Sequence, residues 1–192
     1  MIRFVFSFFG AIFSMATLGL VMAALTVGAV FWVYGRDLPD HESLANYLPP
    51  TISRIYSTEG RIIDEFAEER RIYSAAEEIP ELVKHAFISA EDKNFYLHAG
   101  FDLRGIAAAA YEAVESRGAS VRGASTIPQH VAKISFLSGE RTVDRKLKEI
   151  ILANRMVNSL DRDKILEIYL NEIDLGFRSL GVAAAAQTYI NK

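Results

Sequence analysis

A long uncharged run near the N-terminus sets the first limit on how this chain can fold. Between Arg3 and Arg36 there is no charged residue, and Phe, Leu, Val and Ala dominate. The run is longer than the roughly 20 apolar residues that a helix needs to cross a bilayer core. We therefore predict a short tail and a transmembrane helix over residues 1–36. A cleavable signal is the alternative, because residues 27–29 have a sequence suited to cleavage.

The charges on either side of this run indicate which side of the membrane the chain occupies. Arg3 and the amino terminus precede the run, whereas acidic residues follow Arg36 at positions 37, 40 and 42. The positive-inside rule places the tail in the cytoplasm and the later residues on the periplasmic or extracytoplasmic side of a cytoplasmic (inner) membrane. The chain has no cysteine, so it offers no disulfide and no thiolate chemistry.

One region carries the opposite sign of charge from the chain as a whole. The formal net charge is -3, which argues against a general nucleic-acid-binding protein. Residues 121–150 nevertheless contain six Lys and Arg against three Asp and Glu. A basic region in an acidic protein predicts a site for a specific anionic ligand.

The sequence pattern of residues 37–75 predicts a linker with short strands, and that of residues 76–192 predicts a helical domain. Pro49 and Pro50 should keep the start of the linker extended. Residues 57–60, Ser-Thr-Glu-Gly, have turn composition between two short apolar runs, and we expect a third strand at residues 71–74. These strands are expected to form a small sheet between the anchor and the helical domain.

The first helix of that domain should end at a carboxylate. Val83, Ala86, Phe87 and Ala90 recur at helical spacing and lead directly to Glu91. A carboxylate half sunk against aromatic side chains, here those at positions 87, 95 and 101, has its charged form desolvated, which suits a general acid or base. The alternative is a Glu that caps the helix or forms a salt bridge.

Two further helical patterns carry candidate anion-binding groups. Ser125 or Thr126, ahead of a proline, has the signature of a helix N-cap, and Lys133 lies further along the same helix. Free backbone N–H groups at the helix start, together with that lysine, suit an anion, although capping alone would explain the two hydroxyls. Arg145 and Glu149 share a helix face, but an exposed pair at this spacing has no functional meaning by itself.

The remaining helical patterns predict packing. Residues 105–116, with four consecutive alanines, favour a helix in the core, and a surface-seeking role beside the membrane is the alternative. Residues 118–123 should form a flexible joint. The helix at residues 163–173 should pack through its apolar side chains and expose its charges to solvent. A last helix, from Leu180, stops with the chain, so we expect the domain to be incomplete.

Five ordered motifs resemble those of one known family. The motifs are Glu91-Asp-x-x-Phe95-x-x-His98-x-Gly100, Gly123-x-Ser125-Thr126-Ile127-x-Gln129-x-x-x-Lys133, Arg145-Lys146-x-x-Glu149, Lys164-Ile-Leu-Glu167-x-Tyr169-Leu170-Asn171 and Gly181-x-Ala183-Ala184. Their order and spacing are similar to those of the peptidoglycan glycosyltransferases, glycosyltransferase family 51. With the anchor and the predicted hairpin, nearly the whole chain resembles the N-terminal part of class A penicillin-binding proteins of the 1A type.

The resemblance implies a fold and an activity. It implies a mainly α-helical, lysozyme-like domain, truncated at its C-terminus here, behind a transmembrane helix and a small β-hairpin linker. It implies polymerisation of lipid II into β-1,4-linked glycan strands, with release of undecaprenyl pyrophosphate, in cell-wall synthesis. The implied partners are lipid II, the growing glycan chain, membrane lipid and proteins of cell-wall synthesis or division, with no nucleic acid.

The resemblance also implies residue roles. Glu91 becomes the general base, and Glu149 assists the reacting centre or its leaving group. Binding of the substrate and its pyrophosphate is assigned to six residues: Lys133, Arg141, Arg145, Lys148, Ser125 and Gln129. Site support is assigned to Asp92, Phe95, His98, Gly100, Thr126 and Lys146. A divalent metal, Mg²⁺ or Mn²⁺, is implied without an organic cofactor, and its ligands are unknown.

Some positions depart from the family pattern. His130 replaces a glutamine, Ile134 an asparagine, Asp174 a tyrosine and Leu180 an aromatic residue. No Ser-x-x-Lys sequence occurs, so the transpeptidase motif of class A proteins is absent from these residues. Two alternatives stay open: a catalytically degenerate, membrane-anchored scaffold, and a lysozyme-like enzyme that cleaves glycan.

Overall fold

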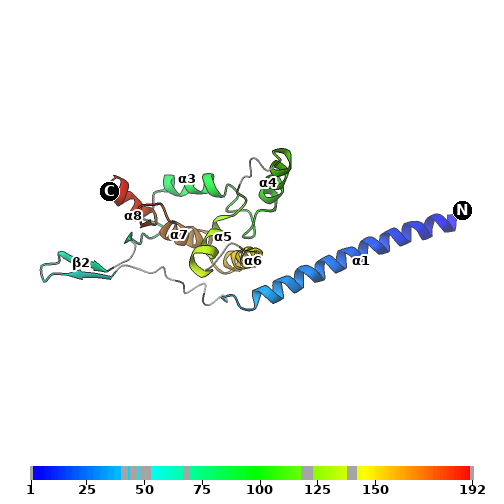
Figure 1. The fold of residues 1–192 in the computed structure, drawn as a ribbon, viewed down its shortest axis with the longest axis horizontal. Coiled ribbons are helices and arrows are strands. Elements are labelled where there is room, and N and C mark those ends of the chain that lie inside the picture. The colour runs from blue at the N-terminus through cyan, green and yellow to red at the C-terminus, as the bar shows by residue number, and fades with distance from the viewer. Residues whose placement is uncertain are drawn as a thin grey trace. The chain divides into compact units, whose positions relative to one another are not determined.

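A computed structural model describes residues 2–39, 43, 47, 53–66, 70–117, 123–137 and 142–190. The chain divides into two compact units, Met1–Leu38 and Pro39–Lys192. Figure 1 shows the elements of each unit.

The first unit is one long helix, α1, which spans Ile2–Gly35. From position 7 onward most of its large apolar side chains are exposed. Thr17 and Thr26 donate their hydroxyls to carbonyls one turn earlier, at 2.8 and 2.9 Å, so these polar groups are satisfied within the helix. In the part of the chain that the structure describes, only Ser7–Gly35 is long and apolar enough to cross a membrane. The predicted helix is confirmed.

The second unit begins with the predicted hairpin. Strands β1, Ser53–Tyr56, and β2, Ile62–Phe66, pair antiparallel. The backbone N–H of Ser57 donates to the carbonyl of Arg61 at 2.7 Å, and Gly60 takes a positive φ of 76° in the turn. The prediction of a third strand of this sheet at residues 71–74 is wrong, because residues 72–74 are not in a strand. Strand β3 covers Arg70–Arg71 and pairs in parallel with β4, Ser179–Leu180, near the end of the chain.

The other described elements of the second unit are helices, so the mainly α prediction is confirmed. In chain order these elements are α3 Glu81–Glu91, α4 Leu103–Glu115, α5 Ile127–Val131, the π-helix η1 Ala132–Phe136, α6 Val143–Ser159, α7 Arg162–Glu172 and α8 Val182–Ile190. The sequence predicted α5 and η1 as one helix, and the structure interrupts it with a π turn that carries Lys133. Such turns are frequent at functional sites.

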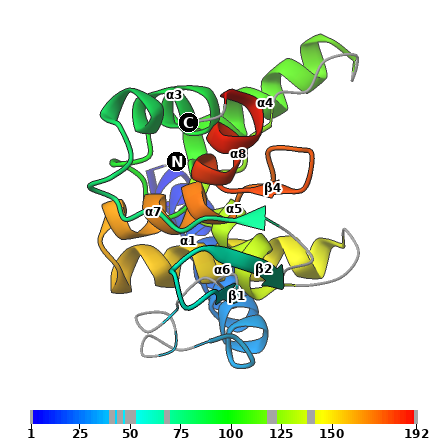
Figure 2. The same ribbon diagram turned by 90° about the vertical axis from the view of Figure 1, so that its left-hand side faces the viewer.

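Helix α7 is the centre of this unit. It contacts α5, α6 and α8, and Tyr169 meets the edge of Phe87 from α3 with ring centroids 6.0 Å apart. In both views it lies between α3 and α6 (Figures 1 and 2). Every residue from Ile165 to Glu172 is buried. The prediction that its charges face solvent is therefore wrong for Glu167 and Glu172, which neighbouring elements cover, whereas Asp163 in the first turn is exposed.

The buried polar groups of α7 hold the segment that leads into α3. The Glu167 carboxylate accepts hydrogen bonds from Tyr73 Oη at 2.6 Å and from the backbone N–H of Ala76 at 3.0 Å, and Lys164 pairs with it. Asn171 exchanges two hydrogen bonds of 2.9 Å with the backbone of Ser74. The bond to Glu167 raises the pKa of the Tyr73 hydroxyl. Buried polar groups need such partners, and here they fix the start of the domain.

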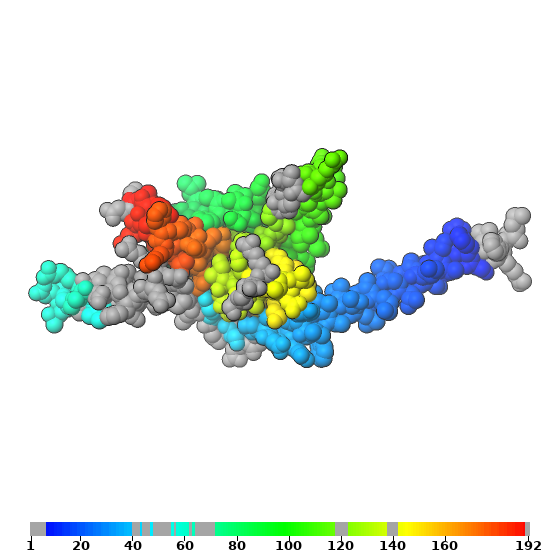
Figure 3. Space-filling view, viewed as in Figure 1, coloured from blue at the N-terminus to red at the C-terminus, as the bar shows by residue number. Residues whose placement is uncertain are grey.

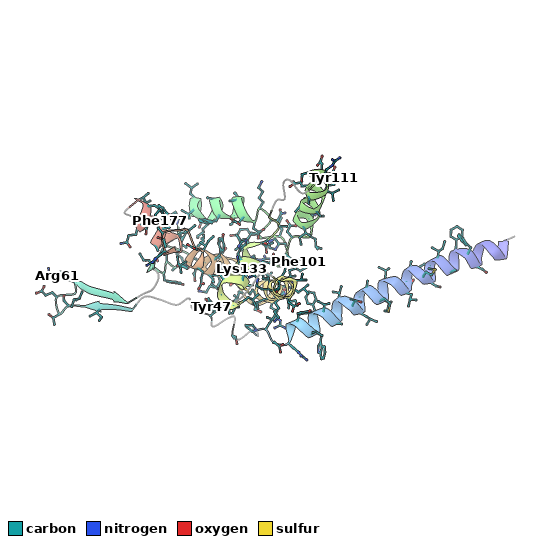
Figure 4. All side chains as sticks on the ribbon, in the orientation of Figure 1. Tyr47, Arg61, Phe101, Tyr111, Lys133 and Phe177 are labelled. Atoms are coloured by element: carbon teal, nitrogen blue, oxygen red, sulfur yellow. The ribbon has the colours of Figure 1, made fainter. Side chains whose placement is uncertain are left out.

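Two predicted packing faces are wrong. On α6 the helical spacing predicts a buried stripe of Leu147, Ile150, Ile151 and Val157, of which only Ile151 is fully buried. The other buried apolar residues of α6 are Leu152, Ala153 and Met156. On α4 the expected core helix buries Ala109 but exposes most of its large apolar side chains, including Tyr111 at 68%. Figure 3 shows α4 at the surface, and Figure 4 labels Tyr111 there. A helix with a run of alanines has few large side chains to bury, so its own sequence does not determine whether it lies in the core or at the surface.

Candidate active site

The predicted carboxylate lies where expected along the chain but is more exposed than expected. Glu91 is the last residue of α3, and its side chain is 41% exposed. Phe87 is only half-buried, and Phe95 is fully buried against Tyr96 and Arg162. The sequence predicted a carboxylate half sunk at the rim against the rings at positions 87, 95 and 101. The helix does end at this residue and leaves it at the rim, while its contact with those rings stays a prediction.

The next residue, Asp92, connects the end of α3 to the start of α5. Its side chain is 2% exposed, and both carboxylate oxygens lie 2.8–2.9 Å from Nε2 of His98. One oxygen also accepts the backbone N–H of Ile127 at 3.0 Å. Nδ1 of His98 accepts the N–H of Gly100, so the ring directs its Nε2 proton to the carboxylate. This network fixes the position from which Glu91 extends.

The loop between Asp92 and α4 is held against two other helices. Thr126 donates its hydroxyl to the carbonyl of Gly100 at 2.7 Å. Arg162 donates to the carbonyls of Phe95, at 2.7 Å, and of His98. Burial lowers the pKa of Arg162. Sequence reasoning missed this arginine, because nothing in its spacing shows that it reaches a loop more than 60 residues earlier.

Helix α5 begins with the predicted N-cap. Thr126 and Gln129 form a capping box, and Pro128 lies in the first turn. Gln129 is 1% exposed, so its side chain is fixed between the helix start and α6. The capping role explains why Thr126 is present at the start of α5. Ser125, one residue earlier, is not needed for the cap and can contact α6.

A cluster of charged side chains on α6 lies against the Ser125 hydroxyl. Lys146 donates from Nζ to Ser125 Oγ at 2.9 Å, to Gln129 Oε1 at 3.2 Å and to Glu149 Oε2 at 2.9 Å. Arg145 Nε lies 3.1 Å from the other oxygen of Glu149, and these two side chains are only 16% and 5% exposed. The reading of this pair as an ordinary exposed ion pair is therefore wrong.

Two adjoining hollows open around these groups. The cationic hollow has a volume of about 540 Å³ and is lined by Ser125, Gln129, His130, Lys133, Arg145, Lys146 and Glu149. The Glu91 hollow has a volume of about 630 Å³, and its polar lining comes from Glu91, Asp92, Lys93, Asn94, Asp102, Arg104, Ser125, Thr126 and His130. Ser125 and His130 line both hollows. The two predicted catalytic carboxylates thus face neighbouring spaces that share a wall. Figure 4 labels Lys133 among α5, α6 and α7.

The structure brings most of the predicted site residues together. Among the described residues predicted for catalysis or substrate binding, Lys148 is the exception, because it lies on α6 but does not line either hollow. The supporting residues Phe95, His98 and Gly100 also lie outside the two linings. Arg141 lies outside the described residues. Lys93, Asn94 and Arg104 were missed, because they belong to no spaced pattern and come together only through the loop after α3.

The described residues do not by themselves make a metal site. Among them, no three His, Asp or Glu side chains are grouped closely enough to hold a metal ion. The best-placed carboxylate in the cationic hollow, Glu149, is already engaged by Arg145 and Lys146. The divalent cation therefore remains a prediction.

Gly100 provides a sharp test of this arrangement. It has a φ of 92°, and a Cβ atom there would lie 2.6 Å from backbone atoms of Ala153 in α6. We expect Gly100→Ala to lower the thermal unfolding midpoint strongly, because neither backbone can move without displacing the loop that positions Glu91. Gly60→Ala is the matched control: it has a φ of 76° in open space, so only the backbone cost of about 1–2 kcal/mol applies. Equal shifts for the two variants would contradict the close packing.

Comparison with known proteins identifies the family. A family model described as Transglycosylase matches residues 59–192. The chain is 45% identical over 168 residues to penicillin-binding protein 1A of Rickettsia bellii, covering 86% of this chain and 21% of the relative. It is 44% identical over 184 residues to penicillin-binding protein 1A of Neisseria meningitidis, covering 96% and 22%. The chain thus spans about a fifth of the length of these curated relatives. It belongs to the transglycosylase family, and it is similar to the glycosyltransferase region of class A penicillin-binding proteins.

Proposed function

We propose that this chain is a peptidoglycan glycosyltransferase that joins lipid II units into β-1,4-linked glycan strands. Family membership supports glycosyl transfer in cell-wall synthesis. The observation that carries the finer assignment is the shared wall between the Glu91 hollow and the cationic hollow. A transfer from a pyrophosphate-linked donor needs a base and an anion-binding group on neighbouring sides of one reacting centre.

The proposed reaction uses Glu91 as the general base. Its carboxylate takes the proton from the 4-hydroxyl of the acceptor sugar as that oxygen attacks C1 of the donor. The new O4–C1 bond forms, the bond from C1 to the pyrophosphate oxygen breaks with inversion, and undecaprenyl pyrophosphate leaves with the electron pair. The exposure of Glu91 at the rim of its hollow supports access by a sugar hydroxyl.

The leaving group is assigned to the cationic hollow. Negative charge develops on the pyrophosphate as its bond to C1 breaks, so fixed Lys and Arg donors stabilise the transition state more than the ground state. Lys133, Arg145 and Lys146 line this hollow. Because Glu149 contacts both Arg145 and Lys146, we assign it the task of orienting these cations for the leaving group.

The proposal also explains why the catalytic domain has a membrane anchor. A substrate with a lipid tail must be processed at the bilayer surface, and α1 is long enough to keep the domain there. We assign residues 1–36 to the tail and anchor, 37–75 to the linker and 76–192 to the catalytic domain outside the cytoplasmic membrane. Membrane lipid and lipid II are the proposed partners, and contacts with other cell-wall synthesis or division proteins remain a prediction.

Incubation of the full chain with lipid II in detergent tests the proposal. We expect elongated glycan strands and released undecaprenyl pyrophosphate, separated by gel electrophoresis and chromatography. Preformed glycan polymer, supplied in a parallel reaction, should remain uncut. Release of short glycans from the polymer without elongation would instead support a lysozyme-like enzyme, and no turnover of either substrate would support a scaffold.

Arginine variants test how the pyrophosphate is held. We expect Arg145→Ala to raise the KM for lipid II by more than tenfold, because the planar guanidinium can bind two phosphate oxygens at once. Arg145→Lys keeps the charge but loses that geometry, so its KM should lie between those of wild type and Arg145→Ala. Steady-state kinetics with labelled lipid II measure both. An unchanged KM in the alanine variant would contradict a role in donor binding.

A further inference from the structure

One residue of the shared wall, His130, departs from the family pattern. Most of its neighbours in the motif match the resemblance, but this position carries an imidazole in place of a glutamine amide. The side chain is 29% exposed and lines both hollows. A group that can change its charge near neutral pH therefore lies between the proposed base and the proposed leaving-group site.

The imidazole is directed toward Glu91. Its Nε2 atom lies 3.7 Å from Oε2 of Glu91. The ring also meets Tyr169 of α7 edge-on, with ring centroids 6.1 Å apart and planes inclined at 70°. Tyr169 is itself fixed by Phe87 of α3. The histidine ring is thus packed against a rigid aromatic pair on one side, with its nitrogen toward the carboxylate on the other.

Charged and titratable groups reach the imidazole from four elements. They are Glu91 of α3, Lys133 of η1, Lys146 and Glu149 of α6, and Tyr169 of α7. Burial lowers the pKa of His130 below its ordinary range. The Glu91 charge opposes that shift, Lys133 and Lys146 add to it, and Glu149 opposes it. Burial and then the Glu91 charge raise the pKa of Tyr169, whose hydroxyl has no hydrogen-bond partner among the described groups.

We propose that His130 is a positioning residue for the Glu91 carboxylate, and that protonation of its imidazole switches off the transfer step. The proposal rests on the proposed function of the site. A neutral imidazole can donate one N–H toward Glu91 and leave the carboxylate basic. A protonated imidazole forms a full ion pair with it, which stabilises the charged carboxylate and makes it a poorer proton acceptor. A glutamine amide can donate but cannot make this change.

The first experiment needs no catalysis. The imidazole resonances of the full chain in detergent micelles are followed by NMR against pH, and the His130 signal is assigned by its loss in His130→Gln. We expect a midpoint below about 6.5, the value for a free histidine. Glu91→Gln should lower that midpoint further, and Lys133→Met should raise it. Glu81→Gln, a change at the other end of α3, is the control and should leave it in place.

The second experiment measures the polymerisation rate against pH. Below the His130 midpoint the wild-type rate should fall about tenfold per pH unit, as expected for loss of one required neutral group. His130→Gln should move this acid limb to lower pH, because protonation of the general base itself is then the remaining cause of the loss. An acid limb that stays at the wild-type pH in His130→Gln, or a His130 midpoint that does not respond to Glu91→Gln, would overturn the inference. A chain that polymerises no lipid II at any pH would instead reject the proposed function, and the NMR midpoints would still test the pairing.

Discussion

Glu91→Gln is expected to lower the rate of lipid II polymerisation by about 10²–10⁴-fold, the usual contribution of a general base. The amide has the same shape as the carboxylate but cannot accept the acceptor sugar's proton. The unfolding midpoint should stay close to that of wild type, because the side chain is 41% exposed and lies at the rim of its hollow. Gel-based detection of glycan strands and circular dichroism measure the two effects.

Glu81→Gln is the matched control for this prediction. Glu81 belongs to the first turn of the same helix and pairs with Lys84 at 2.7 Å, yet it is 71% exposed and lines neither hollow. Its replacement should therefore leave polymerisation at the wild-type rate. Retained activity in Glu91→Gln would reject the assignment of Glu91 as the base, whereas equal losses in both variants would indicate damage to α3 rather than to the chemistry.

Glu149→Ala is expected to affect stability and activity together. Removal of one partner from a buried ion pair takes away the counter-charge of the other, at a cost of about 3–5 kcal/mol in the free energy of unfolding. Arg145 is the partner most affected, since it is 16% exposed. Lys146 keeps its bonds to Ser125 and Gln129 but loses its counter-charge. Urea unfolding of the full chain in detergent measures the first effect, and the lipid II assay measures the second.

A double variant separates the two effects. Replacement of both partners, Arg145→Met with Glu149→Leu, removes the unpaired charge and should recover much of the lost unfolding free energy. Polymerisation should remain absent, because the cationic hollow then lacks both Arg145 and the carboxylate that orients Lys146. A loss below about 1 kcal/mol in Glu149→Ala would show that the pair behaves as an exposed one. Recovery of activity in the double variant would contradict the assignment of these residues to the leaving group.

The buried pair illustrates how far the sequence reached. A spacing of four residues predicted correctly that Arg145 and Glu149 share a helix face. It could not predict that this face is buried, because burial depends on which other helix lies against it. The same limit applies to α7, where Glu167 was expected in solvent and instead bonds the segment before α3.

Features that depend on neighbours along the chain were readable directly. The uncharged run predicted α1, the Ser-Thr-Glu-Gly turn predicted the β1–β2 hairpin, and ordered motifs predicted the family. The end of α3 at Glu91 and the N-cap at Thr126 also follow from local sequence. Each of these is decided by hydrophobic length, turn chemistry or capping within a few residues.

Only the tertiary structure decided how those pieces meet. It paired β3 with β4, placed Arg162 on the loop after Asp92, and set His130 between the two hollows. Such contacts join residues far apart in the chain, and the periodicity of one helix carries no information about the helix that will cover it. The sequence by itself therefore determined the elements and the chemistry available at Glu91 and Glu149, while long-range packing determined which groups surround them.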